Sequence, residues 1–342
     1  MVSVPLVVGL FVVSLAVLLK ASDTFTSSME RIGLGLGISP FVVGATVVAA
    51  GTSLPELASS LLAVLANEPG IVTGSAVGSN VANVFLVLGT VSVLANGIDV
   101  DREVMRVDLP LLVASAVFLL IAAWDGVFVW YEGVLALVGL LVYLEFSISN
   151  PGRFRGPVQS VFVDQFESFG VDDATATEST EPNPEPADDS DSVDVGVRTV
   201  VVAVVSLAFV VLGANYLVES ILDIAAVAGV GSEFVALTAV SIGTSLPEIA
   251  VSVAAVRQGN ANIAVGNVLG SNIFNAFAVM GVPSLVRSLP VSPAIREYAL
   301  PVMVISSVLY IFIAQDREIT RYDGLALLLL YAVFLVNLVS FT

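Results

Sequence analysis

The chain has 342 residues, of which 57% are hydrophobic and 12% charged, with a net charge of −18 and a mean hydropathy of +0.98. Soluble domains carry about 25% charged residues, so this composition excludes an ordinary soluble protein, and no nucleic-acid partner is expected. Cysteine and histidine are absent, which excludes disulfides, Cys/His zinc sites and Ser-His or Cys-His nucleophiles, and leaves oxygen-ligated hard cations as the accessible metal chemistry.

Long apolar stretches predict ten membrane-spanning helices. In chain order they are expected at residues 4–20, 37–66, 71–95, 108–124, 127–146, 197–217, 232–257, 261–286, 299–315 and 321–340. The stretches approach the length needed to cross about 30 Å of hydrocarbon, and they are continuous rather than alternating, which favours helices over a barrel. No basic region precedes the first stretch, so it is expected to be a spanning helix rather than a cleaved signal peptide. Glycine, proline or polar residues interrupt the second, third, seventh and eighth stretches.

An acidic segment divides the chain. Residues 147–196 hold eleven acids and two arginines, which account for half of the net charge of −18. The core of this segment, at residues 172–194, has too few apolar residues to pack, so a disordered linker is expected there. The acid-rich composition, with Lys20 as the only lysine, is typical of proteins from halophiles, where salt screens the repulsion between acids.

The two sides of this linker repeat each other. When the chain is shifted by 192 residues, GTSLPE at 51–56 coincides with GTSLPE at 243–248, and residues 74–89 coincide with 266–281. We therefore expect a first repeat at 1–146 and a second at 197–342. Because each repeat contains five helices, an odd number, the second should be inverted in the membrane. With the linker and ten of the twelve basic residues in the cytoplasm, and only Arg287 and Arg296 outside, both termini are expected to be extracellular.

The repeated hexapeptide places Glu56 and Glu248 within spanning segments. A charge at the bilayer centre costs about 2.5–3.5 kcal/mol or more, and no basic residue lies at that depth in the four interrupted helices. A bound cation is the expected compensation. Pro55 cannot donate to the Gly51 carbonyl, and Thr52 shares a helix face with Glu56, as Thr244 does with Glu248, so further oxygen ligands lie close by. Alternatively the hexapeptide only kinks a helix around a protonated glutamate, but its recurrence at symmetric positions favours the cation.

A second pair of motifs accompanies the first. GSNVAN at 78–83 and GSNIFN at 270–275 place Ser79 with Asn83, and Ser271 with Asn275, on common helix faces. Small polar faces often only hold membrane helices together. Beside the repeated hexapeptide, they are interpreted as the second half of a cation site.

Together these motifs resemble those of the calcium/cation antiporters, and most closely the prokaryotic sodium/calcium exchangers. The resemblance covers both repeats and implies an all-α fold of ten transmembrane helices in two inverted five-helix repeats. It also implies residue roles. Glu56 and Glu248 match carboxylates that bind Ca²⁺ and border Na⁺, and Thr52 and Thr244 match ligands of both ions. The remaining matches are to Na⁺ ligands and to the central amide pair: the carbonyls of Ala49 and Ser241, the hydroxyls of Ser53, Ser245, Ser79 and Ser271, and the amides of Asn83 and Asn275.

The resemblance implies a secondary antiporter of the cell membrane, not an enzyme, that exchanges Na⁺ for Ca²⁺ by alternating access without a prosthetic cofactor and extrudes Ca²⁺. One residue departs from the family pattern: some prokaryotic members have aspartate at the position of Asn275, which leaves the part played by protons open. A proton/calcium antiporter and a potassium-dependent exchanger therefore remain alternatives. An intramembrane protease lacks its catalytic residues here, and a cation channel would show flux without a counter-ion. The oligomeric state is left open.

Overall fold

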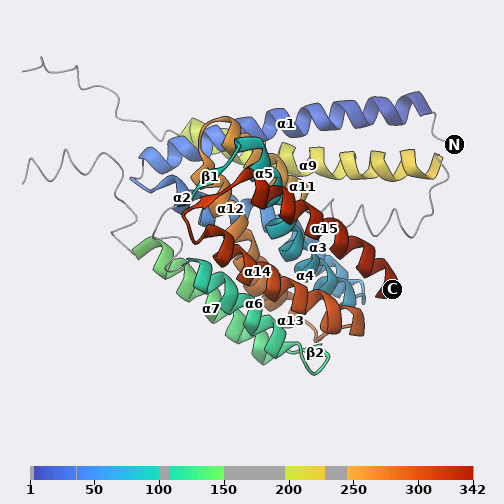
Figure 1. Ribbon diagram of the computed structural model, residues 1–342. Coiled ribbons are helices and arrows are strands. Elements are labelled where there is room, and N and C mark those ends of the chain that lie inside the picture. Colours follow the sequence, from blue (N-terminus) through green and yellow to red (C-terminus); the bar gives the residue numbers. More distant parts are fainter. Residues whose placement is uncertain (1–3, 36, 101–107, 150–196, 228–244, 342) are drawn as a thin grey trace, which may run out of the picture.

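The computed structural model describes residues 4–35, 37–100, 108–149, 197–227 and 245–341, and these are almost entirely helical (Figure 1). Within them, eight helices are long and apolar enough to cross a membrane, and Leu109–Ala122 is a shorter apolar helix. The expected helix at 232–257 is described only from Leu246. The described helices therefore follow the ten expected from the sequence.

The first repeat contains α1 (Val4–Gly35), α2 (Pro40–Val43), α3 (Ala49–Leu65), α4 (Gly70–Ala82), α5 (Gly89–Ala95), α6 (Leu109–Ala122) and α7 (Trp130–Ser149). The second contains α9 (Val197–Val227), α11 (Leu246–Arg257), α12 (Ala261–Phe274), α13 (Met280–Ser284), α14 (Leu300–Ala314) and α15 (Arg321–Phe341). Among the described residues, four π-helical segments join or precede these helices: η1 (Gly44–Val48), η2 (Asn83–Leu88), η5 (Asn275–Val279) and η6 (Ile295–Ala299).

Two helix ends predicted from the sequence are wrong. α1 continues to Gly35 rather than ending near residue 20, and α9 continues to Val227 rather than ending near 217. In the polar run after Lys20, hydroxyls bond to carbonyls one turn earlier: Ser22 Oγ donates to Leu18 O at 2.8 Å, and Ser28 Oγ donates to Thr24 O at 2.8 Å. These buried hydroxyls therefore need no partner outside their own helix.

The interruptions expected in the second, third and eighth helices are π-helical segments within continuous spans. Pro40–Leu65, Gly70–Ala95 and Ala261–Ser284 each form one span, and Pro55 lies inside α3 without ending it. The segments η2 and η5 begin at Asn83 and Asn275, which are equivalent under the shift of 192 residues. π-Helical turns inside α-helices are frequent at functional sites.

The relation between the repeats extends to two short strand pairs. β1 (Ile98–Asp99) pairs with β4 (Glu318–Ile319), and β2 (Val127–Phe128) pairs with β3 (Leu289–Pro290), both antiparallel. Shifting Ile98 forward and Ile319 back by 192 residues gives Pro290 and Val127, which are partners in the other pair. Each pair therefore joins one repeat to the other, and the two pairs are related by the internal symmetry.

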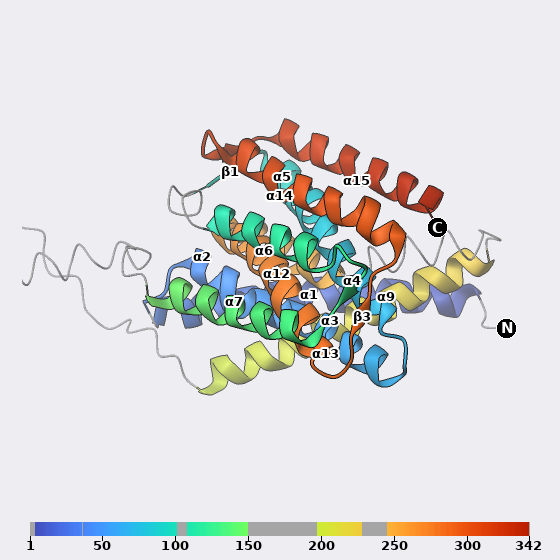
Figure 2. The ribbon, with the colours of Figure 1, turned by 90° about the horizontal axis from the view of Figure 1, so that it is seen from below.

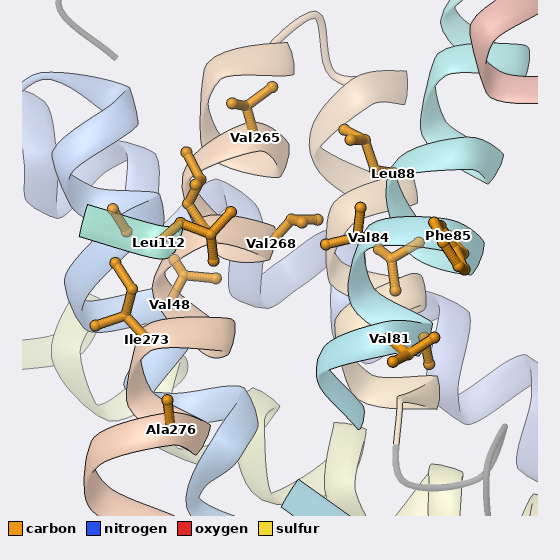
Figure 3. Close-up of a cluster of buried hydrophobic side chains, with 14 of the residues drawn as sticks. Val48, Val81, Val84, Phe85, Leu88, Leu112, Val265, Val268, Ile273 and Ala276 are labelled. Carbon is orange, nitrogen blue, oxygen red and sulfur yellow. The ribbon is translucent and has the colours of Figure 1, made fainter. Parts of the chain in front are cut away.

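The most buried helices form the centre of the bundle. The share of residues that are buried is 89% in the span Ala261–Ser284 and 72% in the span Gly70–Ala95. It is only 22–28% in the spans of α1, α7, α9 and α15. Figure 3 shows apolar side chains from these central spans, including Val81, Val84 and Val268, converging on one another. α1 and α9 pack side by side along one edge of the bundle in both ribbon views (Figures 1 and 2). Motifs on α3, α4, α11 and α12 are thus enclosed by the outer helices.

Candidate functional site

The structure brings the two hexapeptides together. Glu56 lies within α3 and Glu248 in the first turn of α11, with exposed fractions of only 3% and 1%. Ser53 Oγ donates to Glu248 Oε1 at 3.4 Å, so the first copy of the motif contacts the carboxylate of the second. The two carboxylates are also close enough to interact electrostatically. In the described part of the chain, neither glutamate forms a salt bridge with a basic residue.

The partner helix α12 completes this arrangement from the second repeat. Thr52 Oγ1 lies 3.2 Å from Asn267 Oδ1 and 3.4 Å from Ser271 Oγ, and all three side chains are fully buried. The hexapeptide of the first repeat is therefore packed against GSNIFN of the second, as the sequence analysis expects of two halves of one site.

Several buried oxygens here have no hydrogen-bond partner among the described residues. They are Glu56 Oε2, Glu248 Oε2, Asn83 Oδ1, Asn275 Oδ1 and Ser245 Oγ. Most buried polar atoms in folded proteins are paired, because leaving one unpaired costs about 1–3 kcal/mol. Each of these oxygens can accept from a donor or coordinate a metal. Since they come from both repeats and both motifs, a hard cation fits this set better than any single hydrogen-bond donor.

Ten of the twelve residues expected from the sequence fall within the described residues, and all ten are buried. Thr244 and Ser241 lie outside the described residues. The Ala49 carbonyl accepts from Thr52 Oγ1 at 3.3 Å, which places it next to the hexapeptide. Among the described residues no group of three or more Asp, Glu, His or Cys could hold a metal, so the two glutamates would act with neutral oxygens.

The sequence analysis missed two features of this region. Asn80 Nδ2 donates to the Asn272 carbonyl at 3.1 Å, and these asparagines are equivalent under the internal repeat, so they connect α4 to α12 where the two motifs cross. Asn267 contacts Thr52, as described above, and its equivalent in the first repeat is Ser75. Aligning the two repeats shows that Asn267 takes the place of Ser75, and this difference could have indicated Asn267 from the sequence alone.

Comparison with known proteins identifies the family of this chain. The sodium/calcium exchanger protein family matches residues 6–149 and 198–340, which are both repeats without the linker. The chain belongs to this family. It is 34% identical to the sodium/calcium exchanger MaX1 of Methanosarcina acetivorans over 342 residues, covering 96% of this chain and 97% of the relative. It is 32% identical to the uncharacterized membrane protein MJ0091 of Methanocaldococcus jannaschii over 331 residues, covering 97% of each.

A solved exchanger has the same fold. The sodium-calcium exchanger NCX_Mj, soaked with zero Na⁺ and Ca²⁺, superposes with a TM-score of 0.77 at 31% identity, covering 98% of this chain and 100% of that one. The expected all-α, multi-pass, exchanger-like fold is thereby confirmed. Membership in an exchanger family also identifies the protein as a transporter rather than an enzyme.

Proposed function

We propose that this family member exchanges Na⁺ for Ca²⁺ across the cell membrane, with Glu56 and Glu248 as the carboxylates that both ions share. The observation that carries the proposal is the pair itself: two buried glutamates from symmetric motifs, near each other and without a basic partner in the described residues. Two buried like charges repel each other, and a cation between them reverses the sign of the interaction. The exchangers that the chain resembles support the choice of ions.

The surrounding oxygens suit the two ions in different ways. Ca²⁺ takes six to eight oxygen ligands, including carboxylates, so one Ca²⁺ between Glu56 and Glu248 would neutralise both charges. The backbone carbonyls of Thr52 and Thr244 would complete this central site, and the side-chain oxygens of the same residues would bind Na⁺. Several Na⁺ ions would instead share the glutamates with the outer oxygens. In our proposal these are the Ser53, Ser245, Ser79 and Ser271 hydroxyls and the Ala49 and Ser241 carbonyls, with Asn83 and Asn275 on either side of the centre.

Sharing of the two carboxylates would couple the transport of Na⁺ to that of Ca²⁺. Because Na⁺ and Ca²⁺ would need the same carboxylates, they would not occupy the site together, and the ion-free site would leave two uncompensated charges in an apolar interior. Return without a cargo ion is therefore unfavourable, and the transporter exchanges one ion for the other. We assign the alternating movement to α1 and α9, which pack on each other and bury little of their surface in the rest of the bundle. With the termini outside, Na⁺ entry would drive Ca²⁺ out of the cytoplasm.

Uptake of radiolabelled Ca²⁺ by proteoliposomes tests this proposal. Na⁺, K⁺ and proton gradients are imposed one at a time, and an outward Na⁺ gradient alone is expected to drive uptake. Uptake driven by a proton gradient without Na⁺, or uptake that requires K⁺, would instead support the corresponding alternative antiporter. Uptake that needs no counter-ion would indicate a channel.

Two substitutions test the site in the same assay. Glu56→Gln and Glu248→Gln keep the side-chain shape but remove one charge, and each is expected to abolish Na⁺-driven uptake in a folded protein. Leaving a buried charge without its partner costs about 3–5 kcal/mol, so Ca²⁺ affinity should fall by about a hundredfold or more. Glu68→Gln, in the exposed turn after α3, is the matched control and should transport normally. Normal uptake by either buried variant would refute the two-carboxylate site.

A further inference from the structure

The internal symmetry fails at one fully buried position beside the glutamates. Shifting the chain by 192 residues pairs Ser79 with Ser271, Asn80 with Asn272 and Asn83 with Asn275, but it pairs Ser75 with Asn267. Ser75 is partly exposed, whereas Asn267 is completely buried. The second repeat therefore has a longer side chain, with both a donor and an acceptor, at a place where the first has only a hydroxyl.

Both the oxygen and the nitrogen of the Asn267 side-chain amide form hydrogen bonds. Its Oδ1 lies 3.2 Å from Thr52 Oγ1, and its Nδ2 donates to Ser252 Oγ at 2.9 Å and to the Glu248 carbonyl at 3.4 Å. The contact with the Glu248 carbonyl fixes which end is which, because a carbonyl can only accept. Asn267 therefore links the threonine of the first hexapeptide to the helical turn that carries the glutamate of the second.

The direction of the Thr52 hydroxyl proton determines what the Thr52 oxygen can do. A hydroxyl has one proton and two lone pairs, and it can bind a cation only with a lone pair. A proton pointing at the cation would oppose binding. Asn267 Oδ1 at 3.2 Å and the Ala49 carbonyl at 3.3 Å are both acceptors within reach of this proton. The Ala49 carbonyl is itself a proposed Na⁺ ligand, so donation to Asn267 Oδ1 leaves both this carbonyl and the Thr52 oxygen lone pairs for the ion.

We propose that Asn267 is a positioning residue for Na⁺ binding, which acts by accepting the Thr52 hydroxyl proton, while its bonds to the Glu248 carbonyl and Ser252 hold its own amide in place. This inference rests on the proposed function of the glutamate pair. All three hydrogen-bonding contacts of the Asn267 amide are with protein groups. Since Ser75 cannot reproduce these bonds, the two repeats contribute unequally to the site.

The test compares Asn267→Ala with Ser75→Ala. Na⁺ affinity is measured both as the Na⁺ concentration for half-maximal Ca²⁺ uptake and, without transport, as the Na⁺ concentration that stabilises the detergent-solubilised protein against heating. Asn267→Ala is expected to raise both concentrations about three- to tenfold, the value of one lost hydrogen bond. Ser75→Ala should leave both unchanged. If Asn267→Ala does not fold, Asn267→Ser introduces the residue of the first repeat and should show the same weakening.

Substitutions at Thr52 separate positioning from packing. In a Thr52→Val background there is no hydroxyl proton, so adding Asn267→Ala should weaken Na⁺ stabilisation by less than twofold more. In a Thr52→Ser background the hydroxyl remains, and Asn267→Ala should again weaken Na⁺ stabilisation about three- to tenfold, the effect of one lost hydrogen bond. Equal and additive losses in both backgrounds, or a lower melting temperature with unchanged Na⁺ dependence, would overturn the proposal. Failure of the wild-type protein to bind Na⁺ and Ca²⁺ would instead refute the proposed function.

Discussion

Replacement of Gly270 by alanine should disturb both stability and transport, because this glycine lies where α12 crosses η1 and α3. A Cβ atom at Gly270 would contact the Ala45 carbonyl oxygen and lie 2.6 Å from both the Ala45 carbonyl carbon and the Ala49 Cβ. Cβ atoms in proteins do not approach other atoms below 3.0 Å, and the Ala45 atoms here are backbone, so they cannot rotate away. α12 must therefore move away from the segment before the first hexapeptide.

The size of the effect follows from overpacking. One extra methyl group in a well-packed interior costs about 1–3 kcal/mol, so the free energy of unfolding of Gly270→Ala should fall by that amount. Transport should fall as well, because the next residue, Ser271, contacts Thr52 at 3.4 Å, and a shift of α12 lengthens this contact. Thermal unfolding in detergent gives the first quantity, and Na⁺-driven Ca²⁺ uptake gives the second.

Gly9→Ala is the control for this substitution. Gly9 lies in α1, is exposed, and a Cβ there would have nothing within 4 Å. Alanine is favoured over glycine in a helix by about 0.5–1 kcal/mol, so this variant should be as stable as the wild type or more so. If Gly270→Ala unfolds at the wild-type temperature and transports at the wild-type rate, the close crossing of α12 over Ala45 is not needed for the fold or the site.

Two further substitutions test separate features. Asn275→Asp adds a titratable group to the centre of the site, so its Ca²⁺ uptake should fall more steeply than that of the wild type as the pH is lowered, because protonation removes the added negative charge; identical pH profiles would show that residue 275 does not face the ions. Gln258 accepts from Ser27 Oγ at 3.0 Å and donates to the Asp23 carbonyl at 3.0 Å, fastening α1 to the end of α11. Gln258→Ala should lose about 1–3 kcal/mol of this local attachment, and hydrogen exchange in residues 20–30 should accelerate while that in α12 does not.

The sequence was sufficient for the features that depend on composition and repetition. Apolar length located the spans, and the shift of 192 residues identified the equivalent motifs, so the meeting of Ser53 with Glu248 agrees with what the sequence predicts. Hydropathy could not show that α1 continues beyond Lys20, because the next stretch is polar in composition and its hydroxyls are satisfied within the helix by bonds such as Ser22 Oγ to Leu18 O. Local sequence likewise gave no sign that the interruptions would be π-helical segments.

Long-range pairing was also beyond the sequence analysis. β1 and β4 are two residues each, too short for a detectable alternation, and their partners lie in different repeats. Asn267 was missed for a different reason. The repeated motifs contain only residues that both halves of the chain share, whereas the contribution of Asn267 depends on its difference from its equivalent, Ser75.

The two strand pairs limit how the two halves of the chain can move relative to each other. β1–β4 and β2–β3 lie at opposite ends of the bundle and each fastens the front half of the chain to the back half, so a rigid displacement of one half against the other would break both (Figures 1 and 2). α1 and α9, one from each half, lie against each other and belong to neither pair. In the sliding motion that we propose, α1 and α9 would move together and both strand pairs would stay intact. The repeated unit would then not be the unit that moves.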